Sequence, residues 1–417
     1  MTKPSAWSSL GRVPRYESRT WPANPDAYGG RSARKGFVYR AFVPDGIERI
    51  QPVLPSHLVG LISMAEREVD ALNRNPPALA SLEVLARRLL RAESVASSRI
   101  EGLELSQRRL ARAEAAGPEA RDETARSVLG NVAAMEQAVA LGSVARPLTV
   151  ADLLEVHRVL MVATRTPHIA GKLRREQNWL GGTAFNPWKA EFVPPPPEEV
   201  PSLMRDLVAF SNRTDLSAVV QAGLAHAQFE TIHPFADGNG RVGRALIHIV
   251  LRRRGLAPSY VPPVSLVLAA DAKGYVGGLT AYREGRSDEW LQLFAQAVGS
   301  AAAKASELAA RLSALQEAWR ERAGRPRRDS AAEALIRELP ARPIVTLATA
   351  GEMTGRSKQA ANEAIAVLAA AKVLREVTLG KRNRAWEARE LFDLINGVER
   401  ELATPPAGQR RGRPAPR

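Results

Sequence analysis

The 417-residue chain contains no cysteine, and only 5% of its residues are aromatic. The absence of cysteine excludes disulfide frameworks, thiol nucleophiles and cysteine-ligated zinc or iron sites. No stretch approaches ~18 consecutive apolar residues, and the opening MTKPSAWSSLGRVPRYESR lacks the apolar segment of a secretory signal. We therefore expect a protein that has no membrane span and works in the cytoplasm.

Positive charge exceeds negative charge, with 59 Lys and Arg against 44 Asp and Glu and a net charge of +15. The excess lies at the two ends, since residues 1–50 hold nine basic and four acidic residues and residues 321–417 hold 19 and 12. Basic ends are typical of phosphate contacts on a nucleic acid, and also of an ordinary solvated surface. Charge alone therefore leaves DNA binding open.

Apolar residues recur at helical spacing through most of the chain, which predicts a mainly α-helical fold. Residues 1–53, rich in Gly, Pro, Arg and aromatic residues, are expected to form an irregular basic arm. Gly181–Pro197 is the exception to the helical pattern, because its glycines, aromatic residues and proline run favour a hairpin and an extended segment. The predicted helices cover residues 58–73, 79–100, 123–141, 149–163, 197–211, 217–229, 241–254 and 289–320.

The C-terminal quarter has the pattern of a separate small domain at residues 330–400, after a linker at 321–329. Three short helices are predicted at 330–339, 347–354 and 357–371, followed by two strands at 374–379 and 384–386 and a last helix at 388–398. Three helices and a basic strand pair predict a winged helix-turn-helix. The basic residues 401–417 are expected to form a disordered tail.

A winged helix can bind DNA or dock a protein, so its fold alone leaves both functions open. Some of its side chains are of the types that contact phosphates and bases. The candidates for DNA contact are Arg356, Lys358 and Asn362 in the recognition helix, and Lys381, Arg382 and Arg384 in the wing.

The most informative segment is HPFADGNGRVGR, residues 233–244, between two predicted helices. Its glycines face the start of the second helix, where free backbone N–H groups bind anions. Arg241 and Arg244, three residues apart, lie on one side of the first turn, where their charges can reach a phosphate. Asp237 is a hard oxygen ligand suited to Mg²⁺, and His233 is a base near neutral pH. Any one of these features is explained by a loop and a helix cap, but their combination favours a phosphoryl or nucleotidyl transfer site.

This segment matches every fixed position of the motif HPFx(D/E)GNGRxxR, and the chain therefore resembles the Fic family, whose members mostly transfer AMP from ATP to protein hydroxyls. The segments GKLRREQNWLGG (171–182) and AEFVPPPPEEV (190–200) are similar to the part of that family that leads into its flap hairpin. The resemblance covers about residues 54–320. It implies an N-terminal helical region at 54–145, with an inhibitory helix, and a catalytic core at 146–320.

The resemblance implies ATP and Mg²⁺ as the bound groups and gives each motif residue a role. His233 would deprotonate the target hydroxyl, and Asp237 would bind Mg²⁺. Phosphates would be held by Gly238, Asn239, Gly240, Arg241 and Arg244. Phe235 is expected to be a core anchor.

Two further elements of the nucleotide and target site are implied outside the motif. A flap hairpin pairs with the backbone of an extended target segment, and we assign that role to residues 189–193. Phe192 and Val193 of this hairpin are included among the nucleotide-binding residues, and Tyr275 is the candidate for contact with the adenine. A purely structural hairpin is the alternative for this segment.

The segment SSRIEG, residues 97–102, resembles the inhibitory [S/T]xxxE[G/N] helix of the same family. Ser97 and Glu101 share a helix face, and Gly102 can end the helix in the left-handed conformation. By the resemblance, Glu101 pairs with Arg244 and competes with ATP, although the segment read alone is an ordinary helix end. We expect the unmodified protein to be autoinhibited.

These observations predict an autoinhibited protein adenylyltransferase that moves AMP from Mg-ATP to a Ser, Thr or Tyr hydroxyl. The alternatives are a DNA-binding transcriptional regulator whose Fic-like body senses a nucleotide or partner, and an enzyme that removes AMP. Self-modification and a homodimer stay open.

Overall fold

The computed structural model describes residues 14–26, 34–74, 82–117, 122–183, 185–379 and 383–403. The chain forms two compact units, each made of separated segments. Unit 1 comprises residues 1–70, 130–258 and 273–299, and unit 2 comprises residues 71–129, 259–272 and 300–417. These units are not the contiguous domains expected at 54–145 and 146–320.

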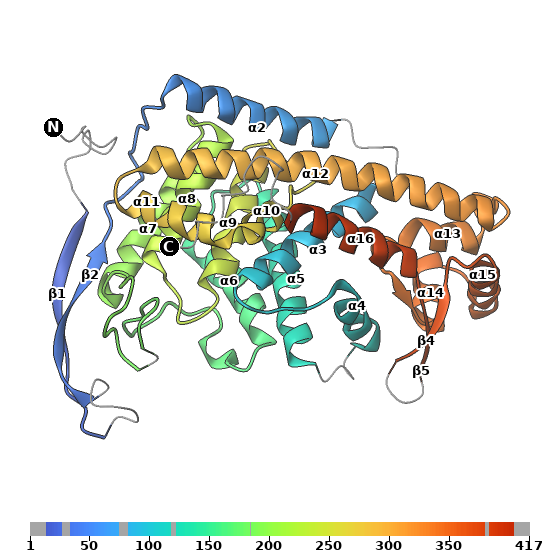
Figure 1. The fold of residues 1–417 in the computed structure, drawn as a ribbon, viewed down its shortest axis with the longest axis horizontal. Helices are drawn as coiled ribbons and strands as arrows, with labels where there is room; N and C mark the ends of the chain where they lie inside the picture. Colours follow the sequence, from blue (N-terminus) through green and yellow to red (C-terminus); the bar gives the residue numbers. More distant parts are fainter. Residues whose placement is uncertain are drawn as a thin grey trace, which may run out of the picture. The chain divides into compact units, whose positions relative to one another are not determined.

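Unit 1 is built around a helix that is buried on all sides, α8 (Ala218–Ile232), which packs against α7 (Val200–Ser211) and α9 (Asn239–Arg253). A helix with apolar residues on every face is stable only inside a core. Close to these helices in sequence are α6 (Val150–Val162), α11 (Ala272–Arg283) and the short 3₁₀ turns η2 (Pro167–Ile169) and η3 (Pro197–Glu199) (Figure 1). Helices α2 (Ser56–Arg74), α5 (Glu123–Gly142) and α12 (Ser287–Arg322) contribute residues to both units.

The N-terminal region contains an antiparallel hairpin of β1 (Arg15–Trp21) and β2 (Phe37–Val43), paired from Arg15 with Val43 to Trp21 with Phe37 (Figure 1). The expectation of an irregular arm was therefore wrong for these residues. Aromatic and β-branched residues at alternating positions support strands even where Pro and Gly are close in sequence. Residues 1–13 and 27–33 lie outside the described residues.

The predicted hairpin at residues 181–197 is closed by a single bridge between Leu180 and Phe192. Leu180 N donates to Phe192 O at 2.8 Å, and Phe42 N of β2 donates to Val193 O at 2.9 Å. The hairpin, which we call the flap (residues 180–193), is therefore tied to β2. Ala184 lies outside the described part of the flap.

In unit 2, α3 (Leu82–Ile100) is followed by α4 (Gln107–Ala116), a helix that the sequence analysis missed. Ser106 caps α4, since its side chain accepts from Arg109 N, and Leu110 is fully buried. The α10 helix (Val264–Ala270), also missed, packs against α3, where Ser265 N donates to the buried Glu93 carboxylate at 2.7 Å.

The C-terminal part of unit 2 has the four predicted helices and the two predicted strands. They are α13 (Ala331–Glu338), α14 (Leu347–Thr354), α15 (Lys358–Ala370), β4 (Arg375–Leu379), β5 (Asn383–Glu387) and the final α16 (Arg389–Ala403). A short strand β3 (Ile344–Val345), not predicted, completes a sheet in the order β3-β5-β4. Ala111 of α4 shares an apolar cluster with Leu379 and Phe392, so this part packs on α4 within unit 2.

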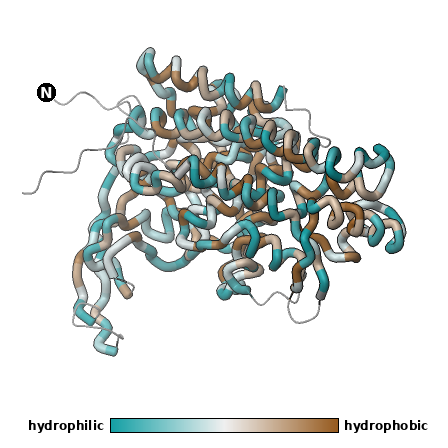
Figure 2. Tube along the Cα trace, turned by 45° about the vertical axis from the view of Figure 1, so that its right-hand side comes forward, coloured by the Kyte–Doolittle hydropathy of each residue, from teal (hydrophilic) through white to brown (hydrophobic). Residues whose placement is uncertain are grey.

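Hydrophilic and hydrophobic bands alternate along helices of the described part of the chain (Figure 2), whereas α8 is buried along its whole length. Among the described residues, no helix is both long enough and apolar enough to cross a membrane. Residues 404–417 of the predicted tail lie outside the described residues, and α16 extends to Ala403.

Candidate functional site

The motif HPFADGNGRVGR forms the end of α8, a short loop and the first turns of α9. His233 is the C-cap of α8 and has left-handed dihedral angles, φ 50° and ψ 60°, with its N–H donating to Phe229 O at 2.9 Å. A non-glycine residue in this region costs conformational energy and is retained where neighbouring contacts fix it. The loop therefore turns the chain sharply at the candidate base.

Residues of an earlier segment, 171–179, donate hydrogen bonds to the backbone carbonyl groups of this loop. Arg174 Nε donates to His233 O at 2.8 Å, and Arg174 N donates to Pro234 O at 2.9 Å. Asn178 Nδ2 donates to Phe235 O at 3.0 Å. No role was predicted for Arg174 or Asn178, although both lie in the segment GKLRREQNWLGG, which is similar to the Fic family.

Asn239 clamps the loop with its side chain. Its Oδ1 accepts from Phe235 N at 2.8 Å and its Nδ2 donates to Phe235 O at 2.8 Å. Because both side-chain amide atoms bind Phe235, the phosphate contact predicted for Asn239 would be made by its backbone N–H. The phenyl ring of Phe235 is fully buried, as expected of a core anchor.

Gly238 meets two requirements that only glycine satisfies. Its φ is +81°, and a Cβ here would lie 3.0 Å from Leu160 Cδ2 and 3.2 Å from Met161 Sδ. The residue is the N-cap of α9, so the backbone N–H groups of the first turn, including that of Gly240, have no partner within the helix. Gly238 and Gly240 therefore present a helix start suited to an anion.

Three charged motif residues surround this helix start. The Asp237 side chain is 60% exposed, whereas the Arg241 side chain is 5% exposed, and the two groups approach to 3.5 Å. Arg244, one turn further along α9, is buried. Two buried guanidinium groups beside an exposed carboxylate give the site a positive interior and an acidic rim.

His157 of α6 also supports the loop, and no role was predicted for it. Its Nδ1 accepts from Gly171 N at 3.0 Å, so its Nε2 carries the proton and donates to Asp237 O at 3.1 Å. The ring stacks on Phe235 with centroids 3.8 Å apart, and burial lowers the pKa of His157 to about 4. A neutral histidine thus fixes the residue that precedes the helix start.

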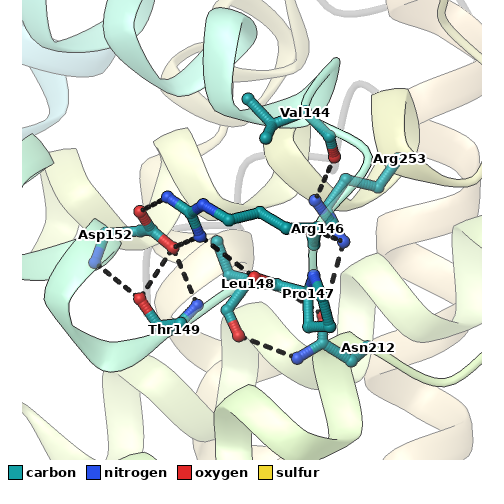
Figure 3. Close-up of polar contacts among 8 residues, drawn as sticks. All are labelled: Val144, Arg146, Pro147, Leu148, Thr149, Asp152, Asn212 and Arg253. Carbon is teal, nitrogen blue, oxygen red and sulfur yellow. Dashed lines mark hydrogen bonds and ion pairs between the residues drawn. The ribbon is translucent and has the colours of Figure 1, made fainter.

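The start of α6 is itself fixed by a polar network (Figure 3). Thr149 and Asp152 form a capping box, and the Arg146 guanidinium donates to both carboxylate oxygens of Asp152 at 2.6 and 2.7 Å. This contact lowers the pKa of Asp152 to about 2. Asn212 exchanges hydrogen bonds with the backbone of Leu148, which joins the start of α6 to the end of α7.

The flap is held by aromatic contacts with the N-terminal hairpin. Trp21 and Trp179 have ring centroids 5.5 Å apart, and Phe37 and Trp188 are 5.1 Å apart. Phe192 lies under the Arg283 guanidinium at 3.9 Å, whereas Val193 is buried. The flap is therefore fixed on three sides, and Phe192 and Val193 keep their nucleotide role as a prediction.

Tyr275 is packed in the core of unit 1. Its side chain is 3% exposed, and its hydroxyl group lies 2.8 Å from His226 Nε2. The neighbouring Val276 is 52% exposed. The predicted contact of Tyr275 with an adenine has no support in this arrangement.

A cavity of about 1590 Å³ opens beside the motif loop. Its walls come from residues 171–179, from the start of the flap at Gly181–Thr183 and from Pro197 and Pro201, and it reaches Ala236 of the motif. The segment that binds the loop carbonyl groups is thus also a wall of this cavity.

Comparison with known proteins identifies this region. Residues 147–251 match the model of the Fic/DOC family, and residues 59–140 match the model described as Fic/DOC family N-terminal. The chain contains a Fic/DOC domain. The loop, the helix start and their supporting residues 157, 174 and 178 all lie inside the matched range of this domain.

Relatives of the Fic/DOC domain include the protein adenylyltransferase Fic of Drosophila erecta, 36% identical over 118 residues, and the protein adenylyltransferase fic-1 of Caenorhabditis briggsae, 32% identical over 118 residues. Each match covers 28% of this chain, and 22% and 21% of the relatives, so less than a quarter of either relative is matched. A Fic family protein from Desulfovibrio desulfuricans G20 has a similar structure, with a TM-score of 0.49 and 20% identity over 81% of this chain and 97% of that one.

The residues of the Fic/DOC domain fit a phosphate-bound Mg²⁺ better than a protein-held metal. Among the described residues, no group of three or more His, Asp or Glu side chains could hold a metal. Mg²⁺ usually keeps several waters and binds through one or two carboxylates and substrate phosphates. The exposed Asp237 carboxylate beside a helix start matches that donor set.

The proposed inhibitory residues lie in unit 2, whereas Arg244 lies in unit 1. Ser97 is fully buried near the end of α3, Glu101 is exposed just beyond it, and Gly102 has a φ of +76°. The left-handed helix end is therefore present as predicted. The pairing of Glu101 with Arg244 stays a prediction.

The candidates for DNA contact differ in their surroundings. Arg356, Lys358 and Asn362 are exposed at and near the start of α15. Arg384 donates twice to Glu376, at 2.8 Å, and its guanidinium lies 5.3 Å from the Trp386 ring. Lys381 and Arg382 lie outside the described residues.

Proposed function

We propose that this protein transfers AMP from ATP to a side-chain hydroxyl of a protein, with His233 as the general base. The observation that carries the proposal is the motif loop, whose carbonyl groups are bound by Arg174, Asn178 and His157 and which leads directly into the start of α9. The named activity of the curated relatives supports the same reaction class.

In the proposed step, the acceptor oxygen attacks the α-phosphorus of ATP while the bond to the pyrophosphate oxygen breaks. The hydroxyl proton moves to the His233 imidazole, and pyrophosphate leaves. The buried guanidinium groups of Arg241 and Arg244 stabilise the negative charge that develops on the leaving side. Bound Mg²⁺, which Asp237 would hold, supplies neutralisation of phosphate charge.

The acceptor is proposed to enter as an extended segment that pairs with the flap backbone at residues 189–193. Within this stretch the N–H groups of residues 190–192 and the carbonyl groups of Phe192 and Val193 already have backbone partners, so the acceptor would have to pair with the remaining backbone groups. Such pairing uses backbone hydrogen bonds and does not depend on the side chain, so a Ser, Thr or Tyr hydroxyl would be placed in the same way. The protein's own exposed hydroxyl groups are further candidate acceptors.

The transfer is tested with Glu101→Gly, the variant that removes the proposed brake. Incubation with ATP labelled at the α-phosphate should label protein in a cell lysate, whereas ATP labelled at the γ-phosphate should not. Adding His233→Ala should abolish the α-label. Label from the γ-phosphate alone would show a kinase-type reaction and contradict the proposal.

We infer a second, compatible function for residues 330–400, which we interpret as a winged helix that binds DNA. The exposed Arg356, Lys358 and Asn362 support this function. Binding of a random duplex should weaken steeply with salt, and Lys358→Ala should reduce both the affinity and the salt slope. Salt-independent binding, or an unchanged Lys358→Ala slope, would favour a protein-docking role.

Removal of AMP is the alternative reaction for the same site: water would attack the phosphorus of the AMP–protein ester and give up a proton to His233, the bond to the protein oxygen would break, and that oxygen would take up a proton as AMP leaves. A time course would separate the two reactions. If removal dominates, a target protein that already carries AMP should lose it when incubated with the unmodified enzyme and keep it when incubated with His233→Ala. We place both reactions in the cytoplasm, and a homodimer is compatible with either.

A further inference from the structure

We propose that Arg174 is a positioning residue that holds the catalytic loop and the base of the flap together. The proposal rests on the proposed transfer reaction for its kinetic readout. It concerns residues of unit 1 alone.

The Arg174 side chain donates to four backbone carbonyl groups from three segments. At the end of α8 and the start of the motif loop, Nε donates to His233 O at 2.8 Å and Nη2 donates to Ile232 O at 3.4 Å. In two other segments, Nη2 donates to Pro195 O at 2.5 Å and Nη1 donates to Glu176 O at 3.1 Å. Pro195 lies two residues beyond the end of the flap at Val193, so one guanidinium connects the backbone of the candidate base to the segment that leaves the flap.

The chemistry of this contact requires arginine. The residue is 6% exposed, and its side-chain hydrogen bonds all go to neutral carbonyl oxygens. Burial lowers the pKa of Arg174 to about 10, so the group stays protonated at neutral pH. A lysine ammonium is a compact point charge and cannot span acceptors that lie on opposite sides of a planar fork.

The contact acts at the strained residue of the site. His233 has left-handed dihedral angles, and its carbonyl oxygen is held by Arg174, with Asn178 Nδ2 further away at 3.4 Å. If Arg174 is lost, the His233 carbonyl loses its shorter hydrogen bond, and the backbone that directs the imidazole is held less firmly. The start of α9, which would hold the phosphates, keeps its own clamp through Asn239. Catalysis should therefore suffer more than nucleotide binding.

The kinetic test compares Arg174→Lys with Arg213→Lys, both made in the Glu101→Gly background. Arg213 is a matched control in unit 1, because it also donates to two backbone carbonyl groups, Glu48 O at 3.1 Å and Ile50 O at 2.6 Å, away from the motif. Arg174→Lys should lower kcat by roughly 10- to 100-fold with KM for ATP within about two-fold. Arg213→Lys should leave both constants within about two-fold of the parent.

Chemical rescue separates positioning from general stability. In Arg174→Ala, added methylguanidinium should restore part of kcat, because it can fill the vacated site and bind the same carbonyl groups. Arg213→Ala should show no such response. An Arg174→Lys variant with the kcat of its parent would overturn the proposal.

Hydrogen exchange tests the same coupling without any enzymatic readout. In Arg174→Lys, amides of residues 229–240 and of residues 185–196 should both exchange faster, whereas Arg213→Lys should change neither segment. If the parent transfers no AMP while this joint change occurs, the proposed function fails and the positioning role stands. If neither segment changes in Arg174→Lys, the positioning role is wrong.

Discussion

Two helical glycines of unit 1 have opposite surroundings. A Cβ on Gly243 of α9 would lie 2.9 Å from Phe229 Cδ1 and would also meet the buried Glu230 carboxylate. A Cβ on Gly277 of α11 would meet nothing within 4 Å. We expect Gly243→Ala to lower the free energy of unfolding by about 1–3 kcal/mol, because α8 and α9 cannot separate to accept the methyl group.

Gly277→Ala is the control for this glycine prediction. It should raise the free energy of unfolding by up to about 1 kcal/mol, the usual gain when alanine replaces an exposed helical glycine. Urea denaturation of both variants checks the pair. Equal effects of the two substitutions would contradict the packing of α8 on α9 described above.

Two buried histidines make stability depend on pH. Burial lowers the pKa of His157 to about 4 and that of His226 to about 3, both below the ordinary value of 6.5. The folded protein keeps both rings neutral, so the unfolded chain binds more protons below pH 6.5 and stability falls as the pH falls toward 4. Each ring contributes a slope of about 1.4 kcal/mol per pH unit in this interval.

Unfolding measured between pH 7 and pH 4.5 tests this dependence. His157→Gln should flatten the slope relative to the unmodified protein. A slope that His157→Gln does not alter would show that His157 accepts a proton in the folded state.

At the scale of elements, the start of α6 depends on the network in Figure 3. Asp152 accepts from Arg146, and also from Thr149 N and Oγ1 at 2.8 Å. Asp152→Asn removes the charge pair and should lower the free energy of unfolding at pH 7 by about 1–2 kcal/mol. Glu155→Gln on the same helix breaks only an exposed pair with Arg158 and should cost at most about 0.5 kcal/mol in a thermal or urea titration.

The same network predicts a second pH dependence, at lower pH. Because Arg146 lowers the pKa of Asp152 to about 2, below the ordinary value of 3.8, the stabilisation is complete above pH 3.8 and is lost as pH falls toward 2. The difference in stability between the unmodified protein and Asp152→Asn should therefore shrink in that interval. A constant difference would contradict the ion pair.

Helix α16 contacts the end of α3 within unit 2. Glu399 accepts from Arg99 at 2.8 Å and from Gln107 at 3.0 Å, and its side chain is 18% exposed. Glu401, two residues further along α16, pairs with Arg311 and is 46% exposed. We expect Glu399→Gln to destabilise unit 2 by about 1–2 kcal/mol and Glu401→Gln by at most about 0.5 kcal/mol, as measured by urea denaturation.

This contact also concerns the proposed brake, since Arg99 lies two residues before Glu101. If Glu399→Gln loosens the end of α3, hydrogen exchange of residues 96–103 should accelerate in that variant and not in Glu401→Gln. Unchanged exchange at these residues would show that α3 holds its end without α16.

Element by element, the sequence predicted the long amphipathic helices well, because burial of one face leaves a helical period that can be read directly. It missed α4, whose Arg-rich pattern hides the buried Leu110, and α10, which is short and uniformly apolar. It also missed β1 and β2, which contact residues far away in sequence, such as Trp179 next to the flap, whose ring meets that of Trp21.

At the site, the motif predicts which groups would bind a nucleotide, but it does not predict which residues hold the loop that carries them. His157, Arg174 and Asn178 bind backbone carbonyl groups, and such contacts leave no spacing signal in the sequence. Tyr275 was placed at the base pocket by resemblance, whereas its ring packs against His226 and Trp290. The role of a residue that binds backbone groups or fills a core depends on the tertiary fold, so it could not be predicted from the sequence.

At the scale of the whole molecule, each compact unit collects segments from distant parts of the chain. The Fic/DOC motif lies in unit 1, and the residues of the proposed brake and the C-terminal three-helix and sheet region lie in unit 2. A contiguous reading of domains could not find this division, because it depends on which segments pack together. The division also places the proposed catalytic and regulatory residues in different units.

The measurement that tests the central claim most directly is transfer of α-phosphate-labelled AMP from Mg-ATP onto the protein itself and onto lysate proteins. The unmodified protein, Glu101→Gly and Glu101→Gly/His233→Ala are compared at equal concentration. We predict weak labelling by the first, strong labelling by the second and none by the third. Absence of labelling by folded Glu101→Gly, or equal labelling by all three proteins, would contradict the account.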